Sequence, residues 1–314
     1  MLELKNYCIT EIENLQEVMT IIYVVVDDLY KEVTPTSIKE RKNKENAKMS
    51  DSEIITLALT GESMGIDSET GWYNFVKKNY SALFPNMCDR TRYNRTRRDL
   101  AGVTEAMRQR LNDFMEDYFS TDRIVDSFPL EVCEFGRAHF CQSFKGENAD
   151  YGHCASKKET YFGYKVHDVT TPEGYITDFV VTPASTDDRD ALLDLAVTKN
   201  HHYCMFGDKG YINTLLSDFL LEHRNISLFA MKKSNAKEPY PAMIARTIFK
   251  IRRRIETTFS QLDGQFNSER TFARTFHGLL TRLISKFFAF NLMFFINFAL
   301  GNFLNPARVK SIIF

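Results

Sequence analysis

Apolar side chains in the first 118 residues recur every three or four positions, which is the spacing of one face of an α-helix. The pattern covers residues 12–33, 54–62, 72–84 and 103–118. Ser50 and Glu53 stand three residues apart just before the second segment, an arrangement typical of a capping box. The pattern therefore predicts an all-helical N-terminal region.

After Thr121 the pattern changes to short apolar runs rich in β-branched and aromatic residues, which indicate strands. We predict strands at residues 123–127, 161–170, 175–182, 203–206 and 226–231. Pro172 to Gly174 is a turn signal that joins the second and third strands into a hairpin. Helical segments follow at residues 187–197 and after Asn213. Strands followed by alternating helices and strands predict a mixed α/β sheet with helices on its faces.

Two long helices are predicted near the C-terminus. Residues 244–266 carry apolar side chains at spacings of three and four, with Glu256 at the edge of that stripe and Arg252 one turn before it. Residues 279–304 are apolar throughout and long enough to cross a membrane. Because Arg282, Lys286, Asn291 and Asn297 interrupt that run, we expect a helix buried against the sheet instead.

The composition is that of a soluble globular protein, with 44% hydrophobic and 26% charged residues among 314. A formal net charge of −1 gives no overall basic signal, so binding to nucleic acid must depend on local patches. The N-terminus shows no signal peptide, and the six cysteines include no CxxC pair, so we expect a cytoplasmic protein with reduced thiols. Cys133, His139, Cys141, His153 and Cys154 are zinc-ligand types, but their spacing fits no usual structural zinc site.

One segment concentrates positive charge. Residues 89–99 contain five arginines together with Tyr93 and Asn94. Such a run can lie along a phosphate backbone, or it can be a solvated helix face flanked by Asp89 and Asp99, and the sequence leaves both open. A second basic region extends from Lys232 to Arg254.

Three acidic residues stand in contexts that suggest one site. Asp126 and Asp208 each end a predicted strand, and Glu256 lies on the long helix beside arginines. Three carboxylates converging at a sheet edge would suit Mg²⁺ or Mn²⁺. Two such ions would stabilise the attacking and leaving oxygens of a phosphoryl transfer.

Two competing interpretations of these acids involve helix capping. Asp208 alone could simply cap the helix that begins near Asn213. Asp187, Asp188 and Asp190 offer a different second acid, although their place before a helix is explained by capping and by the helix dipole.

Five short motifs occur in a specific order: Ile124 to Ser127, Phe162 to His167, Thr182 to Arg189, Phe206 to Tyr211 and Arg253 to Glu256. Together they resemble the DDE transposases of bacterial insertion sequences, most closely the insertion sequence nine-eighty-two family, over about residues 120–300. The resemblance implies a ribonuclease-H-like catalytic domain in which Asp126, Asp208 and Glu256 hold the metal ions. It also implies cleavage at the ends of a mobile element and joining of the freed 3′-ends to target DNA.

The chain departs from related families around the last acid. Those families carry Tyr, Arg, Glu and Lys where this chain has Phe249, Arg252, Glu256 and Asp263. The arginine and the glutamate match, whereas the tyrosine and the lysine are missing. Arg253 or Arg254 would have to supply the missing cation.

From the motifs and the resemblance we expect a helical DNA-contacting region over residues 1–119 and a ribonuclease-H-like DDE catalytic domain over residues 120–314. The expected partners are the terminal inverted repeats and the target DNA, bound by a homodimer, with no membrane involved. The expected location is the bacterial cytoplasm at the nucleoid. The expected cofactors are two Mg²⁺ or Mn²⁺ ions per active site. A metal-dependent nuclease without a joining step and a catalytically silent DNA-binding protein remain the alternatives. The residues expected to contact DNA are Arg90, Arg92, Arg95, Arg97, Arg98, Lys165, His167, Lys209, Arg252, Arg253 and Arg254.

Overall fold

The chain packs as two units. The computed structural model describes residues 12–154, 158–195, 202–233, 235–302 and 307–308. Unit 1 comprises Met1–Asp117 and Leu262–Phe314, and unit 2 comprises Tyr118–Gln261. The first boundary lies near the expected one. The second boundary, at Leu262, falls inside a helix. The residues after it pack with the N-terminal helices and not with the sheet.

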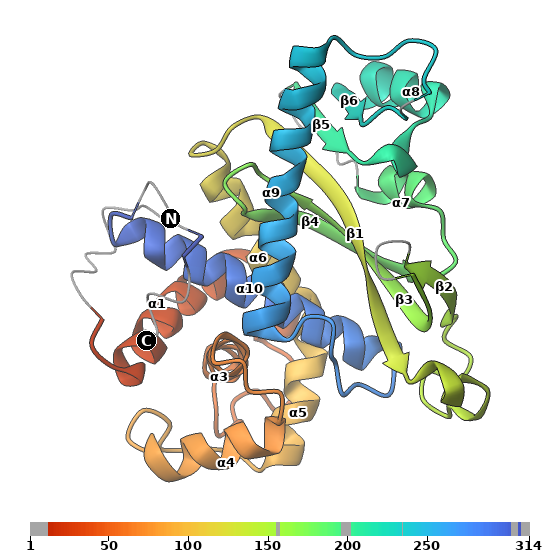
Figure 1. Cartoon of the computed structure of the whole chain (residues 1–314). Helices are drawn as coiled ribbons and strands as arrows, with labels where there is room; N and C mark the ends of the chain where they lie inside the picture. Colours follow the sequence, from red (N-terminus) through yellow and green to blue (C-terminus); the bar gives the residue numbers. More distant parts are fainter. Residues whose placement is uncertain (1–11, 155–157, 196–201, 234, 303–306, 309–314) are drawn as a thin grey trace. The chain divides into compact units, whose positions relative to one another are not determined.

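Unit 1 is helical, as the apolar spacing predicts. The capping box at the start of α3 is present, with Ser50 accepting from the Glu53 backbone N–H and the Glu53 carboxylate accepting from Ser50. Its described helices are α1 (Leu15–Val33), α2 (Thr36–Lys39), α3 (Asp51–Ser63), α4 (Glu69–Asn79), α5 (Arg90–Asp99), α6 (Ala101–Glu116), α10 (Phe276–Ala299) and the last residues of α9 (Ala242–Phe266) (Figure 1).

Helix α10 forms the core of unit 1. Its phenylalanines, among them Phe287, Phe290 and Phe294, are fully buried, and the helix contacts α3, α5 and α6. We expected this segment against the sheet; it is instead covered by the helices of its own unit. Within the described residues it is the one helix long and apolar enough to span a membrane, but 89% of that stretch is buried inside the protein, as in the core helix of a soluble protein.

A buried group of charges connects α3, α5 and α10. The carboxylate of Glu62 lies 2.7 Å from Arg97, 3.0 Å from Lys286 and 3.5 Å from Arg282. Burial alone would raise the pKa of Glu62, but the three cations outweigh it and lower that pKa to about 2. Removing one partner of such a group leaves uncompensated charge in the interior.

We predict that Glu62→Gln destabilises the protein by about 3 kcal/mol, because Lys286 and Arg97 would lose their nearest counter-ion and keep only Asp67 at 3.6 Å and Glu69 at 3.8 Å. Denaturant unfolding followed by circular dichroism measures the loss. The control is Glu45→Gln, which removes the same charge at an exposed position. Equal stability of the two variants would show that the buried group does not hold the helices together.

Unit 2 is a mixed α/β sheet with flanking helices. The described strands form a six-stranded sheet in the order β2-β3-β1-β5-β6, with β4 paired to β3 as well. The predicted hairpin is β3 with β4, and β5 runs parallel to both β1 and β6. The elements are β1 (Asp122–Cys133), β2 (Asp150–Cys154), β3 (Glu159–Thr170), β4 (Ile176–Pro183), α7 (Asp188–Leu195), β5 (Tyr203–Gly207), α8 (Thr214–Arg224), β6 (Ile226–Ala230), the first part of α9, and the 3-10 turns η2 (Phe135–Phe140) and η3 (Lys209–Tyr211).

The two faces of this sheet are covered by different helices. Val125, Val169 and Met205 pack with Leu192 of α7 and Leu220 of α8 in one apolar cluster. Helix α9 passes over the sheet (Figure 1). The ring of Phe259 on α9 packs edge to face on that of Phe128 on β1, with 5.0 Å between the ring centroids. Because successive side chains of a strand point to opposite faces, Asp126 lies on the side of Phe128 and α9.

Candidate active site

The parallel pairing of β1 with β5 brings the first two acids to the same level. Ile124 is the register partner of Phe206, so two residues further along each chain Asp126 stands beside Asp208. Asp208 follows β5 directly, as expected. Asp126 does not end its strand, however: β1 continues to Cys133, because its later residues pair with β3.

Arg252 links the first acid to the third. Its guanidinium lies 3.0 Å from Asp126 Oδ2 and 3.5 Å from Glu256 Oε1. Arg252 and Glu256 are one turn apart on α9, which is why both reach the same place. The side chains of Asp126 and Arg252 are each 18% exposed, whereas that of Glu256 is 52% exposed. Arg252 therefore connects two of the three expected acids, and strand register brings the third, Asp208, level with Asp126.

The protonation of Asp126 reflects this crowding. Burial raises its pKa to about 6; Arg252 and the Ser127 backbone N–H oppose the rise, and the neighbouring charge of Asp208 adds to it. The cost of burying this carboxylate therefore outweighs the stabilisation that Arg252 gives to its charged form.

Two further residues, neither of which was predicted as a site residue, lie near this group. Asp168 on β3 is the register partner of Asp126 and is fully buried. Tyr211 is buried as well, and burial followed by the charges of Asp188, Asp126, Asp208 and Asp168 raises its pKa well above the ordinary value. The available signal for Asp168 was an acid on a predicted strand between the apolar Val166 and Val169.

The rival acids have other partners. The Asp187 carboxylate lies 2.6 Å from the guanidinium of Arg189. This contact is the main reason why the pKa of Asp187 falls to about 2. Asp188 Oδ1 accepts from Lys165 Nζ at 3.1 Å and lies 3.6 Å from His167. The cap of α8 is Asn213, not Asp208.

Asp208 caps only the short turn η3, accepting from the Gly210 N–H at 2.6 Å. A residue larger than glycine would clash at position 210, because its Cβ would lie 2.9 Å from Asp208 Oδ1 and 3.2 Å from Asp188 Oδ2.

Several residues expected to contact DNA already have partners within the protein, and two of them, Arg97 and His167, are buried. His167 is fully buried and bonded to Thr182 at 3.0 Å, so it presents no surface to a ligand. Lys165 is held by Asp188 and Thr186, and Arg254 donates to the carbonyl of Pro172. In unit 1, Arg97 is buried in the Glu62 group and Arg90 pairs with Glu69 at 3.4 Å.

Of the expected DNA contacts, the exposed ones are Arg90, Arg92, Arg95, Arg98, Lys209, Arg253 and Arg254. Lys209 opens onto a cavity of about 790 Å³ beside Asp208. Lys232, Lys233 and Lys237 also line this cavity, which carries more basic than acidic side chains. Such a surface next to a group of carboxylates is suited to a polyanion.

In the described part of the chain, no three His, Cys, Asp or Glu side chains already stand in a metal-binding arrangement, and this holds for the Cys/His segment as well. The chemistry of the donors nevertheless fits a divalent cation. Strand register sets Asp126 level with Asp168 and Asp208, whose carboxylate oxygens are hard donors, and the guanidinium of Arg252 lies between Asp126 and Glu256.

Comparison with known proteins identifies the class. A family model described as a transposase DDE domain matches residues 119–276, half of the chain, and the chain belongs to this family. Transposase function and a DNA substrate follow from that membership, and DDE transposase domains generally use divalent metal ions. No curated protein and no solved structure matches the chain.

The raised pKa of Asp126 predicts a pH-dependent cost in the metal-free chain. Since the fold prefers the neutral acid, the stability from this residue is present below pH 3.8 and is lost as the pH rises through about 6. Asp126→Asn cannot ionise, so in EDTA its melting temperature should exceed that of wild type by a few degrees at pH 7.5, with a smaller difference at pH 4. Thermal unfolding at both pH values tests this, with the exposed Asp218→Asn as control. A variant less stable than wild type at pH 7.5 would contradict the raised pKa.

Proposed function

We propose that this chain cleaves the ends of a mobile DNA element and joins the freed 3′-ends to target DNA. The observation that carries the proposal is the convergence of Asp126, Asp208 and Glu256, from two strands and a helix, beside a basic cavity. Membership of the transposase DDE family supports the same activity. Of bacterial insertion sequences, the nine-eighty-two family is the one that the motifs resemble most, and we propose a ribonuclease-H-like arrangement for unit 2.

Asp126, Asp208 and Glu256 would hold two Mg²⁺ or Mn²⁺ ions, for which the crowded carboxylates are suitable donors. When bound, such ions activate the attacking oxygen and neutralise the departing one. The fold supplies the other requirements: β1 and β5 fix the two aspartates, and α9 carries the glutamate. Arg252 must release Asp126 for the carboxylate to bind an ion, and it can then meet a DNA phosphate.

The basic side chains around the site would position the DNA. Lys209, Lys233 and Lys237 line the cavity beside Asp208, and Arg253 lies exposed on α9 one turn from Glu256. Their charges attract phosphates without reading sequence. We propose a homodimer on DNA in the bacterial cytoplasm, since the two ends of an element must be cut and joined together.

Replacing the three acids tests the proposal. Asp126→Asn, Asp208→Asn and Glu256→Gln should each reduce Mg²⁺-dependent nicking and strand transfer about a thousandfold, because each removes several kcal/mol of transition-state stabilisation. Affinity for DNA should stay within a few-fold of wild type. The assay follows labelled DNA containing the flanks of the gene, and a pre-cut end separates joining from cleavage.

Asp263→Asn is the matched control, because Asp263 is an exposed acid on the same helix. Full activity in any of the three variants would remove that residue from the site. Cleavage without joining of the pre-cut end would identify a nuclease, and DNA binding with no cleavage by wild type would identify a silent DNA-binding protein.

Gly210 gives an independent test of the geometry. Gly210→Ala places a methyl group against Asp208 and Asp188, so the rate of cleavage should fall at least tenfold while DNA affinity is retained. Gly264→Ala is the control, because a Cβ there meets nothing within 4 Å. Unchanged cleavage by Gly210→Ala would show that the Asp208 carboxylate need not stay where it is.

A further inference from the structure

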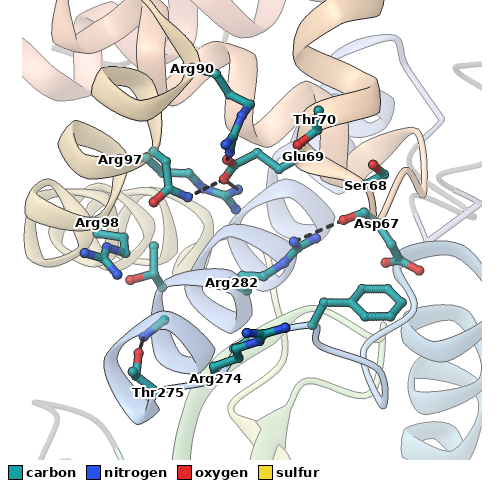
Figure 2. Close-up of a pocket in the computed structure, with 15 residues that line it drawn as sticks. Asp67, Ser68, Glu69, Thr70, Arg90, Arg97, Arg98, Arg274, Thr275 and Arg282 are labelled. Carbon is teal, nitrogen blue, oxygen red and sulfur yellow. Dashed lines mark hydrogen bonds and ion pairs between the residues drawn. The ribbon is translucent and has the colours of Figure 1, made fainter. Parts of the chain in front are cut away.

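Unit 1 contains a second charged cavity, well separated in sequence from the carboxylates. Its volume is about 710 Å³, within the range of ligand pockets. It is formed by the start of α4, one side of α5 and the segment that leads into α10 (Figure 2). The side chains that give it its charge are five arginines, Arg90, Arg97, Arg98, Arg274 and Arg282, against the two carboxylates Asp67 and Glu69.

Three of these arginines are anchored. Arg97 is buried against Glu62, and Arg282 lies 3.5 Å from Glu62 and donates to the carbonyl of Asp67 at 3.1 Å. Arg90 pairs with Glu69 at 3.4 Å. Because neighbouring acids hold these side chains, they form a fixed wall rather than a set of mobile cations.

The other two arginines are available. Arg98 and Arg274 are exposed, come from α5 and from the segment before α10, and make no ion pair with any residue in the described part of the chain. Figure 2 draws no interaction for either of them, whereas Arg282 is shown bonded to Asp67. Two unpaired guanidinium groups above a cationic wall attract an anion.

An aromatic ring completes the lining. Phe272 lines the cavity with 73% of its surface exposed. An exposed phenylalanine beside arginines is the combination that binds single-stranded nucleic acid, with phosphates on the cations and a base stacked on the ring. An acidic peptide would use the arginines but would leave the ring without a partner.

We propose that this cavity binds a single strand of DNA, with its phosphates at Arg98 and Arg274 and a base on Phe272. The proposal rests on the proposed function, because it assigns a second DNA contact to a transposase. The proposed site differs from the DNA contact predicted for the arginine run of α5. Arg92 and Arg95 of that run do not line the cavity, whereas residues between Phe272 and Arg282 do.

Fluorescence anisotropy with a labelled 30-nucleotide strand tests this on the full chain in EDTA, which prevents cleavage. Arg98→Gln/Arg274→Gln should weaken binding at least tenfold and flatten the slope of log affinity against log salt by about 1.4, or about 0.7 for each lost phosphate contact. Phe272→Ala should weaken binding about fivefold or more without changing that slope. Lys77→Gln/Lys78→Gln is the matched control, because it removes two exposed charges from α4 outside the cavity, and it should bind within twofold of wild type.

A loss in the control equal to that in the arginine variant would overturn the proposal, because binding would then follow overall charge. Wild-type affinity in the arginine variant would overturn it too, as would an acidic peptide of equal charge that displaces the strand as well as unlabelled DNA does.

Phenylglyoxal modification of wild type needs no variant: bound DNA should protect Arg98 and Arg274. Cleavage in Mg²⁺ is measured on the same wild-type protein. If cleavage persists while the cavity variants bind normally, only the cavity proposal fails; if wild type neither binds nor cleaves DNA, both proposals fail.

Discussion

The parallel pairing of β1 with β5 is the constraint on which the site depends. It places Asp126 beside Asp208, while the antiparallel pairing with β3 places Asp168 opposite Asp126. Like charges on neighbouring strands repel, so the sheet is stable here only if positive charge is close by or protons are bound. Arg252 supplies part of that charge from α9, but burial still raises the pKa of Asp126 to about 6. A divalent cation held as proposed would add the missing positive charge.

The sequence was informative wherever a pattern reports local structure. Apolar spacing predicted the helices of unit 1 and the long helix α9, and the turn at Pro172 to Gly174 predicted the β3–β4 hairpin. The mixed sheet with flanking helices also followed from the order of the elements. The three acids were chosen as candidates because two follow apolar runs and one lies beside arginines, and their role as metal ligands stays a prediction.

What the sequence could not provide depends on contacts between distant residues. The strand that contains Asp126 continues to Cys133 because β3 pairs with it, which no local pattern indicates. Residues 279–304 are apolar enough for several environments, and only packing decides that α10 is covered by α3, α5 and α6. The role of Asp168 depends on register, which one residue of slippage would change.

The arginines of α5 show the same limit most clearly. In sequence they form one basic run, but in the structure their side chains have different surroundings. Arg97 is buried against Glu62, Arg90 pairs with Glu69, and Arg98 lines the cavity with its side chain exposed. A buried acid therefore decides which cations remain for a ligand. Unit 1 thus uses arginines both to hold its helices together and to line a charged cavity.

The most direct test of the central claim is anomalous diffraction from Mn²⁺ bound to the wild-type chain in complex with DNA. Convergence of the carboxylates predicts Mn²⁺ between Asp126 and Asp208, with Glu256 turned toward it and Arg252 withdrawn from Asp126. Manganese bound elsewhere, or Arg252 still bonded to Asp126 with no metal beside it, would contradict the proposal that these three acids form one metal-binding active site.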